Sequence, residues 1–251
     1  MPNVSACMTM RTGGVSAGVY GALDGKDGLN LGVHVGDDLH VVAENRARLR
    51  AVLPSEPAWL TQVHGTQILD AATVLGSDAR TLTHPPPAPE ADASFTNQAD
   101  VVCSIMTADC LPVLLADVSG KIVAAAHAGW RGLAAGVLAA TVQHMRDAGA
   151  GQIQAWLGPA IGPATFQVGE DVRQAFISHN ALLASAFEPQ AGQGGKYLAD
   201  IYALTKALLA EDNVTMVTGG DACTVSEPER FYSFRRDGVT GRMAALIWRT
   251  V

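Results

Sequence analysis

The stretch "IVAAAHAGWRGLAAGVL", residues 122–138, decides the fold because its pattern changes from strand to helix around two glycines. The apolar run Ile122–Ala126 is typical of a buried strand. The glycines that follow permit a tight turn, and helical spacing begins at Leu133. The stretch therefore predicts a strand–turn–helix unit with His127 at the carboxyl end of the strand, where α/β sheets commonly bind ligands.

The rest of the chain repeats these two patterns in short segments. Strands are expected at Ala58–Val63, Val101–Met106, Val113–Asp117, Ile122–Ala126, Ile153–Leu157, Thr215–Val217 and Ala244–Trp248. Helical spacing occupies Val41–Val52, Leu133–Ala148, Glu170–His179 and Ile201–Ala210. Strands mixed with helices of this length predict an α/β or α+β layered fold, and the number of strands favours two stacked sheets.

Two segments are expected to be loops. The proline-rich "THPPPAPEAD", Thr83–Asp92, should be exposed and should stay outside the sheets, because proline lacks the N–H that a strand needs. "QAGQGG", Gln190–Gly195, predicts a second flexible loop. Neither is typical of a domain linker, because short apolar segments of similar character lie on both sides.

The composition is that of an ordinary globular protein, with 48% hydrophobic and 16% charged residues. Its 251 residues are enough for one large domain or two small ones. A net charge of −7 without a dense Lys/Arg cluster argues against nucleic acid as a partner. Small anionic substrates are not excluded by the net charge, because a few local arginines can bind them. Composition predicts no particular oligomeric state.

The sequence favours a cytoplasmic protein. The N-terminal "MPNVSACMTMRTGG" lacks a cationic region followed by an apolar core, so no signal peptide is expected. The most apolar stretch, Ile122–Val142, is interrupted by His127 and Arg131, so no association with a membrane is expected. The four cysteines form no CxxC pair, which favours free thiols or a metal ligand over disulfides. They are Cys7, Cys103, Cys110 and Cys223.

Three residues with metal-binding side chains each follow an apolar strand, in a tight turn. They are His64, Cys110 and His127, and Pro112 is expected to prevent regular strand pairing near the cysteine. Two imidazoles and one thiolate leave a fourth position for water or substrate, which is typical of a catalytic zinc site. Their long separation in the chain gives no short zinc motif, so a structural histidine and an inert core cysteine remain alternatives.

Other polar residues stand near this trio or in glycine-rich loops. Asp109 precedes Cys110, and Arg131 lies in the turn after His127, where backbone N–H groups attract anions. Three arginines close together in "FYSFRRDGVTGRMAALIW" could clamp a phosphate. A surface ion pair for Arg131 and a solvated hairpin for the three arginines are the simpler interpretations.

The chain resembles the YfiH-like family, also called the laccase-domain, polyphenol-oxidase or peptidoglycan-editing-factor family. The matching segments follow the family order and run from about Arg11 to Trp248. They are "MRTGGVSAG", "LNLGVHVGDD", "TQVHGTQI", "ADASFTNQADVVCSIMTADCLPVLLAD", "AAAHAGWRGLAAGVL", "LGPAIGPATFQVGEDV" and "FYSFRRDGVTGR".

The resemblance implies an α+β fold over residues 1–251, a single-domain four-layer α-β-β-α sandwich with mixed sheets. It implies a metal, usually zinc, held by His64, Cys110 and His127. It also implies phosphorolysis of purine nucleosides (adenosine, inosine and, in some members, 5′-methylthioadenosine) together with adenosine deamination. Copper-dependent oxidation of phenols, and zinc hydrolysis that edits peptidoglycan precursors, are the alternatives that the resemblance brings.

The nucleoside activity fits the residues better than multi-copper oxidation, because laccases use several coppers and more histidines than the seven present here. One Cys/His/His centre could still bind Cu²⁺, which outcompetes Zn²⁺ for most such ligands. Zinc with an open position would activate water for deamination. Phosphorolysis needs phosphate held against the ribose. We therefore expect Arg11, Asn30, Arg131 and Arg235 to bind substrate, and Asp109 and Cys110 to be catalytic, with Asp109 as a proton carrier or as an orienter of a zinc histidine.

Overall fold

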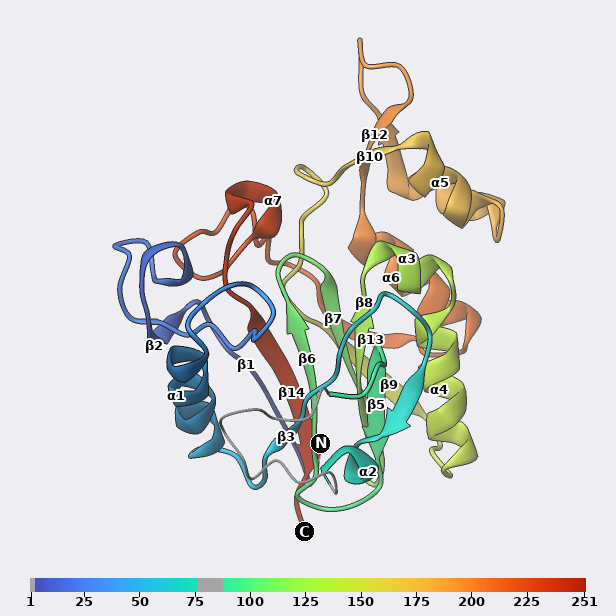
Figure 1. Ribbon diagram of the computed structural model, residues 1–251. Coiled ribbons are helices and arrows are strands. Elements are labelled where there is room, and N and C mark those ends of the chain that lie inside the picture. Colours follow the sequence, from blue (N-terminus) through green and yellow to red (C-terminus); the bar gives the residue numbers. More distant parts are fainter. Residues whose placement is uncertain (1–2, 76–87) are drawn as a thin grey trace.

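The computed structural model describes residues 3–75 and 88–251 and shows a mixed α/β fold (Figure 1). A four-stranded sheet has the order β1–β14–β6–β3, and a six-stranded sheet has the order β13–β9–β7–β8–β5–β4. Both contain parallel and antiparallel pairs, as expected for mixed sheets. A small third sheet, β10–β12–β11, projects from one end of the molecule.

The strands of the first sheet are β1 (Val4–Met8), β3 (Pro57–Ala58), β6 (Val102–Thr107) and β14 (Met243–Arg249). Those of the second are β4 (Ile68–Asp70), β5 (Ala93–Thr96), β7 (Leu111–Asp117), β8 (Val123–Ala128), β9 (Ile153–Leu157) and β13 (Met216–Gly219). The small sheet has β10 (Gln167–Gly169), β11 (Phe187–Pro189) and β12 (Lys196–Ala199), and β2 (Thr12–Ser16) lies apart from the three. The helices are α1 (Leu39–Arg50), α2 (Ala71–Leu75), α3 (Trp130–Ala134), α4 (Val137–Asp147), α5 (Glu170–Ile177), α6 (Ile201–Glu211) and α7 (Phe234–Asp237), with 3-10 turns at Gly18–Tyr20 and Ala181–Ala186.

The two large sheets pack face to face. Alternate residues of β6 and β14 meet alternate residues of β7 and β8 in one buried apolar cluster, whose members include Cys103, Ile105, Ala245, Ile247, Leu114, Ala116, Val123 and Ala125. This alternation puts the other residues of each strand on the outer faces. The outer face of the four-stranded sheet packs with Leu49 of α1, and that of the six-stranded sheet packs with α4 and α6 (Figure 1).

The strand–turn–helix unit of residues 122–138 is present, with two differences from the prediction. His127 lies inside β8 instead of after it, because pairing with β7 continues to Ala128. The predicted helix Leu133–Ala148 is two helices, α3 and α4. They part at Gly136, whose φ of +94° is a left-handed conformation that favours glycine.

The predicted strand Ala58–Val63 is wrong beyond Ala58. Only the two-residue β3 pairs with β6, and the chain then leaves the sheet towards His64. The Gln62 side chain takes over the contact with β6, because its amide donates to the Met106 carbonyl and accepts from the Met106 N–H, both at 2.8 Å. The loop that carries His64 is thereby fixed to the sheet without being a strand.

Two expectations about prolines are also corrected. Pro112 does not prevent pairing: it is the second residue of β7 and lies opposite His127, where one missing donor costs little of the ladder. Of the loop predicted at Thr83–Asp92, the part up to residue 87 lies outside the described residues. At its end Glu90 is exposed, as expected, although it bridges Thr61, whereas Ala91 and Asp92 are fully buried. Gln190–Gly195 does form a loop, between β11 and β12.

Within the described part of the chain, none of the helices combines the length and the apolar character needed to cross a membrane.

Candidate metal centre

His64, Cys110 and His127 meet at one end of the two sheets. Their ligand atoms all lie within 4.8 Å of one another, and Cys110 Sγ is 3.7 Å from His64 Nε2. They come from the loop after β3, the turn between β6 and β7, and the end of β8. Among the described residues, this is the one group of three or more His, Cys, Asp or Glu side chains with such spacing. Two imidazoles and a thiolate are a ligand set that suits Zn²⁺ or copper.

A buried carboxylate, Asp92, holds two of these ligands in place. It accepts hydrogen bonds from the backbone N–H groups of Val63 (3.1 Å), His64 (2.9 Å) and Gly65 (2.6 Å), and its Oδ1 lies 2.8 Å from His127 Nδ1. His64 has a φ of +60°, which is uncommon for a residue other than glycine and needs such support. The contact with Nδ1 fixes the His127 ring and leaves Nε2 as its free nitrogen, as in many metal-binding histidines.

Gly129 lets the turn after β8 pass close to the ligands. A Cβ atom at this position would lie 2.7 Å from Cδ2 of His64 and 3.0 Å from Sγ of Cys110. Any larger residue would displace one of these two side chains. The first glycine after His127 therefore serves close packing around the ligands, in addition to permitting the turn.

The neighbouring charges in the cluster shift the pKa values of Cys110, His127 and Asp92 towards their ionised forms. Burial acts against ionisation of Cys110, but His127 and His64 beside it lower the pKa of the thiol. Burial likewise opposes protonation of His127, but the Cys110 thiolate and Asp92 raise its pKa. For Asp92, the hydrogen bonds from His127 and the backbone outweigh burial and lower the pKa of the carboxyl. The cysteine is thus held as the thiolate, the form that binds metals.

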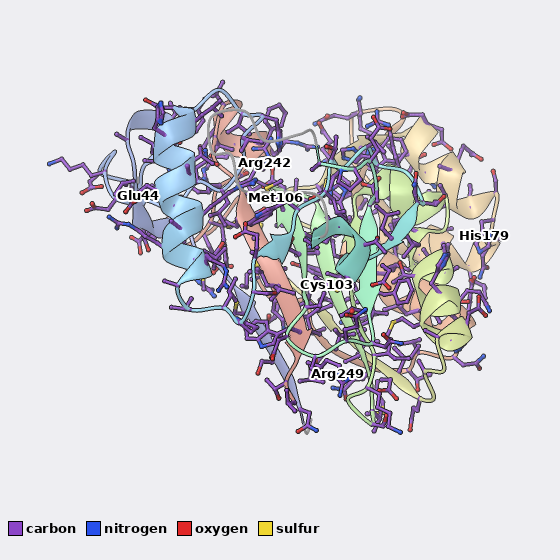
Figure 2. All side chains as sticks on the ribbon, turned by 60° about the horizontal axis from the view of Figure 1, so that its bottom comes forward. Glu44, Cys103, Met106, His179, Arg242 and Arg249 are labelled. Atoms are coloured by element: carbon purple, nitrogen blue, oxygen red, sulfur yellow. The ribbon has the colours of Figure 1, made fainter. Side chains whose placement is uncertain are left out.

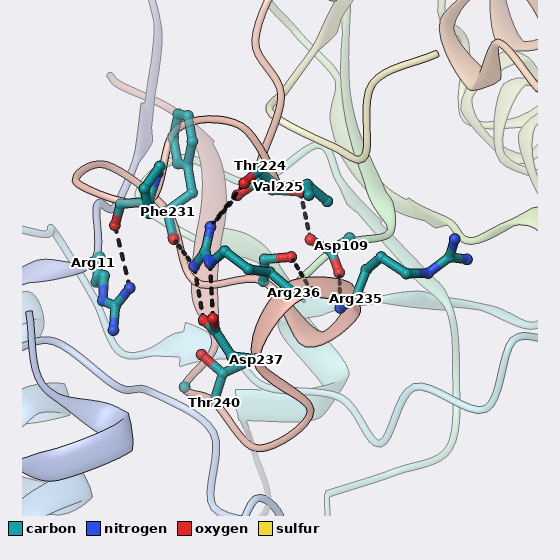
Figure 3. Close-up of polar contacts among 12 residues, drawn as sticks. Arg11, Asp109, Thr224, Val225, Phe231, Arg235, Arg236, Asp237 and Thr240 are labelled. Carbon is teal, nitrogen blue, oxygen red and sulfur yellow. Dashed lines mark hydrogen bonds and ion pairs between the residues drawn. The ribbon is translucent and has the colours of Figure 1, made fainter. Parts of the chain in front are cut away.

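Asp109 does not orient a histidine, and that part of its predicted role is corrected. Its Oδ1 accepts a hydrogen bond from the Thr224 hydroxyl (2.5 Å) and its Oδ2 accepts one from the Arg235 N–H (2.7 Å), as Figure 3 shows. The contact with His127 belongs to Asp92 instead. Asp109 joins the turn that carries Cys110 to the segment around α7, and proton transfer by Asp109 stays a prediction.

Arg11 and Asn30 are buried inside the protein and engaged there. Arg11 Nε donates to the Gly21 carbonyl at 2.8 Å, and its guanidinium lies over the Tyr232 ring. Asn30 is fully buried, with Oδ1 accepting from the N–H groups of Gly32 and Arg242, both at 2.9 Å. The predicted contact of these two side chains with substrate is not supported, because their polar groups already bind protein atoms.

Arg131 and Arg235 are exposed, as residues that bind substrate must be. Arg131 lies over the ring of Trp130, 4.6 Å from its centroid, and Trp130 is half-buried and packs on the apolar core. Arg235 Nη1 donates to the carbonyls of Thr165 (3.4 Å) and Gln167 (3.2 Å). Arg131 therefore keeps its predicted role as a candidate, whereas Arg235 joins two loops of the protein.

Asp92 does not stand out in the sequence, because it ends the proline-rich stretch that is predicted to be a loop. The available signal was a carboxylate placed directly before a short apolar segment, "ASFT", which becomes β5. A charged residue at the start of a buried strand is costly unless it has partners, and this one has two of the three metal-binding residues as partners.

The sequence and the fold were compared with known proteins. Residues 5–250 match the model of the multi-copper polyphenol oxidoreductase laccase family. The chain belongs to this laccase-domain family. It is 50% identical over 248 residues to the purine nucleoside phosphorylase YfiH of Escherichia coli, and 49% identical over 245 residues to a purine nucleoside phosphorylase of Pseudomonas aeruginosa. Each alignment covers 98% of this chain and 93% of the relative.

Solved structures of the laccase-domain family share the fold. A Neisseria meningitidis protein has 45% identity and a TM-score of 0.86, covering 99% of this chain and 95% of that protein. YlmD of Geobacillus stearothermophilus has 31% identity and a TM-score of 0.83, covering 99% and 93% of the two chains. The resemblance found in the sequence is therefore confirmed, and the relatives named as phosphorylases indicate an enzyme.

Proposed function

We propose that this protein is a zinc-dependent purine nucleoside phosphorylase that acts on adenosine and inosine, and in addition on 5′-methylthioadenosine, and that it also deaminates adenosine. The observation that carries the proposal is the His64–Cys110–His127 cluster, held by a buried carboxylate in a chain that is about half identical to named phosphorylases. The substrates are a small nucleoside and inorganic phosphate.

The donor set fits zinc. Two imidazoles and one thiolate are neutral and anionic ligands of the kind that catalytic zinc sites use, and the thiolate is favoured by the histidines around it. A bound zinc ion with an open position supplies a Lewis acid and lowers the pKa of water to about 7. The chain's own part is to fix this ligand geometry, through Asp92 on two of the ligands.

Phosphorolysis requires two further things of the protein. Phosphate must be held against C1′ of the ribose, and the negative charge that develops on the departing purine must be stabilised. Arg131 follows the ligand-bearing strand β8 and is exposed, so its guanidinium is available to an anion. Trp130 beneath it positions the guanidinium by stacking, while packing on the core.

The count of histidines argues against multi-copper oxidation as the main activity. Of the described histidines other than the two ligands, four remain, and all are exposed. They are His34, His40, His144 and His179, and His84 lies outside the described residues. A single three-ligand cluster does not provide the several copper sites that phenol oxidation in laccases uses.

The test is turnover of inosine with phosphate by the zinc-loaded protein. We expect release of hypoxanthine that depends on phosphate, and separately the conversion of adenosine to inosine without phosphate. Cys110→Ser should reduce both by more than about 100-fold, since loss of a ligand exceeds the 10–100-fold effect typical of an outer partner. Cys7→Ser, on β1, is the matched control and should retain activity.

Zinc-loaded protein that releases no hypoxanthine from inosine contradicts the proposal. Release of an amino acid or peptide from a cell-wall precursor would then favour the hydrolase alternative. Full phenol oxidation after loading with copper, without phosphorolysis by the zinc form, would favour the oxidase alternative.

A further inference from the structure

Arg242 lies at the same end of the sheets as the metal centre. It immediately precedes β14, whose first residue, Met243, lies opposite Thr107, the last residue of β6. The chain turns from Thr107 into Asp109 and Cys110, and the Thr107 hydroxyl donates to the Cys110 carbonyl. Figure 2 shows Arg242 and Met106 at this end of the four-stranded sheet. The charges of Cys110 and Asp109 act on the Arg242 guanidinium, while burial lowers its pKa.

The loop of residues 29–38 fixes the base of the Arg242 side chain. The backbone N–H of Arg242 donates to Asn30 Oδ1 at 2.9 Å, and Asn30 Nδ2 donates to Asp37 Oδ2 at 3.0 Å. Gly32 leaves room for the stem, because a Cβ atom there would lie 2.8 Å from Cγ of Arg242. An arginine held in this way loses little freedom when it binds a ligand.

The guanidinium of Arg242 keeps donors for a ligand. Its Nη1 donates to the carbonyls of Thr240 and Gly241, both at 3.1 Å. Among the described residues, no carboxylate lies within ion-pairing distance of Arg242, and none accepts a hydrogen bond from its Nε or Nη2. Arg11 differs because it uses Nε as well as Nη1 for protein carbonyls. Arg235 has the same two donors left, but its Nη1 anchors it to the loop carbonyls of Thr165 and Gln167.

His34 adds a second donor: it lies two residues after Gly32, whose backbone approaches the Arg242 stem, and its side chain is exposed. Burial, together with the charges of Arg242 and Arg46, lowers the pKa of His34, so its ring is neutral and carries one N–H. Arg46 is engaged elsewhere: its Nε donates to the Leu31 carbonyl at 2.9 Å and its guanidinium lies over Trp59. Arg242 therefore supplies the positive charge, and His34 a hydrogen-bond donor, for an anion bound at this place.

We propose that Arg242 and His34 form the subsite that binds the phosphate co-substrate beside the metal centre. This inference rests on the proposed phosphorylase function. It selects Arg242 from the three clustered arginines and replaces Arg11 and Arg235 for this task, with Arg131 left to the charge on the departing purine. Nε and Nη2 of a guanidinium present two parallel donors to phosphate oxygens. The imidazole N–H of His34 would supply a third donor.

The test is a calorimetric titration of the zinc-loaded protein with inorganic phosphate, alongside the KM values for phosphate and for inosine. Arg242→Gln should weaken phosphate binding and raise the KM for phosphate by about 10- to 100-fold, the range for lost hydrogen bonds to a charged group, with the KM for inosine nearly unchanged. Arg242→Lys should recover only part, because it keeps the charge without the paired donors.

His34→Gln is a second variant. Because the His34 side chain is exposed, its replacement should not impair folding. It should weaken phosphate binding by about 3- to 10-fold through loss of one donor. Arg48→Gln is the matched control: it removes an exposed arginine of α1 that pairs with Glu44, and phosphate binding should not change. Thermal unfolding of every variant separates binding defects from loss of the fold.

The outcomes distinguish this subsite from the proposed function. Phosphorolysis with unchanged phosphate affinity in both Arg242→Gln and His34→Gln overturns the subsite and leaves the function standing. Wild-type protein that does not bind phosphate at millimolar concentration also overturns it. Phosphate binding that Arg242→Gln abolishes, in a protein that cleaves no nucleoside, supports the anion subsite and refutes the phosphorylase.

Discussion

Two buried aspartates, Asp92 and Asp109, lie next to members of the metal-binding cluster, and they serve different parts of the molecule. Asp92 lies far from Cys110 in the sequence but contacts His127 and the backbone at His64, both members of the metal-binding cluster. Asp109 is the immediate neighbour of Cys110 but contacts Thr224 and the backbone of Arg235, which lie in the segment that leads into α7. Adjacency in the chain therefore does not identify the carboxylate that controls the ligands.

The difference follows from the directions of the backbone. Asp92 enters β5, which lies next to β8 in the sheet, so its carboxylate reaches a ligand at the end of β8. Asp109 lies in the turn between the two sheets, and its side chain points towards the segment before α7 (Figure 3). One aspartate thus orients metal ligands, and the other ties two loops together.

The largest expected effect is that of Asp92→Asn. An amide keeps the shape but places an NH₂ where the backbone N–H groups and His127 now donate, so several hydrogen bonds are lost. Affinity for zinc should fall by about 10- to 100-fold, as for other partners of metal-binding histidines. The free energy of unfolding of the metal-free protein should fall by about 3 kcal/mol, from donors left without partners. Zinc titration against a competing chelator and thermal unfolding measure the two effects.

A matched control for this variant is Asp70→Asn, at the end of β4, where the carboxylate accepts a hydrogen bond from the Ala72 N–H. Zinc affinity should not change there. If Asp92→Asn binds zinc as tightly as the wild type, the distinction between Asp92 and Asp109 is lost.

Protons should compete with zinc at His127, and Asp92 should set how strongly they compete. Because the pKa of His127 is raised in the metal-free protein, zinc must displace a proton from it near neutral pH. Zinc affinity should therefore rise about tenfold per pH unit from about pH 6.5, the ordinary histidine value, up to the raised pKa. Stability of the metal-free protein should change in the opposite sense: the contribution of His127 is complete below the ordinary pKa and is lost as the pH rises through the raised one.

The measurement compares the pH dependence of zinc affinity in the wild type and in Asp92→Asn. In Asp92→Asn, one of the causes that raise the pKa of His127 is removed, so the rise in zinc affinity should level off at a lower pH. Chelator-buffered zinc titrations between about pH 6 and 9 cover the range of ordinary and raised histidine values. Parallel curves for the two proteins would show that Asp92 does not control the proton on His127.

Much of the fold was predictable because periodicity reports burial. The strands β6, β7, β8, β9 and β14 are apolar runs whose side chains are buried on the faces of the two large sheets. All five are predicted from the sequence. β5 was missed because a short strand that follows prolines carries too few residues for a pattern. The helix break at Gly136 was missed because spacing alone does not report a left-handed residue.

The candidate site was predictable to a lesser degree. Position after apolar segments brought His64, Cys110 and His127 forward as candidates, because ends of neighbouring strands come together. The family resemblance was needed to prefer them as ligands over a structural histidine and a core cysteine. The partners of these residues depend on tertiary contacts. Asn30 and Arg11 stand in glycine-rich loops that resemble binding loops, yet the fold buries them. In the sequence Arg242 is only one of several arginines. What distinguishes it is its packing against Gly32, which is distant in the chain.

The smallest expected effect on the metal is that of Asp109→Asn. The Thr224 hydroxyl can turn to satisfy an amide oxygen, but the Arg235 N–H and the new NH₂ would both be donors. The free energy of unfolding should fall by about 1–2 kcal/mol, the cost of one or two imperfect hydrogen bonds. Zinc affinity should change by less than about threefold, because no ligand contacts this carboxylate directly, in contrast to the 10- to 100-fold range for partners that do.

The same variant tests whether Asp109 carries a proton. If it does, the kcat for inosine falls while zinc affinity and the KM for phosphate stay near the wild-type values, a combination that a loss of positioning alone would not give. Unchanged kcat together with reduced stability would assign Asp109 to the structure only. A fall in zinc affinity equal to that of Asp92→Asn would mean that both aspartates govern the ligands, since the turn that bears Cys110 would then depend on Thr224 and Arg235 as strongly as the His64 loop depends on Asp92.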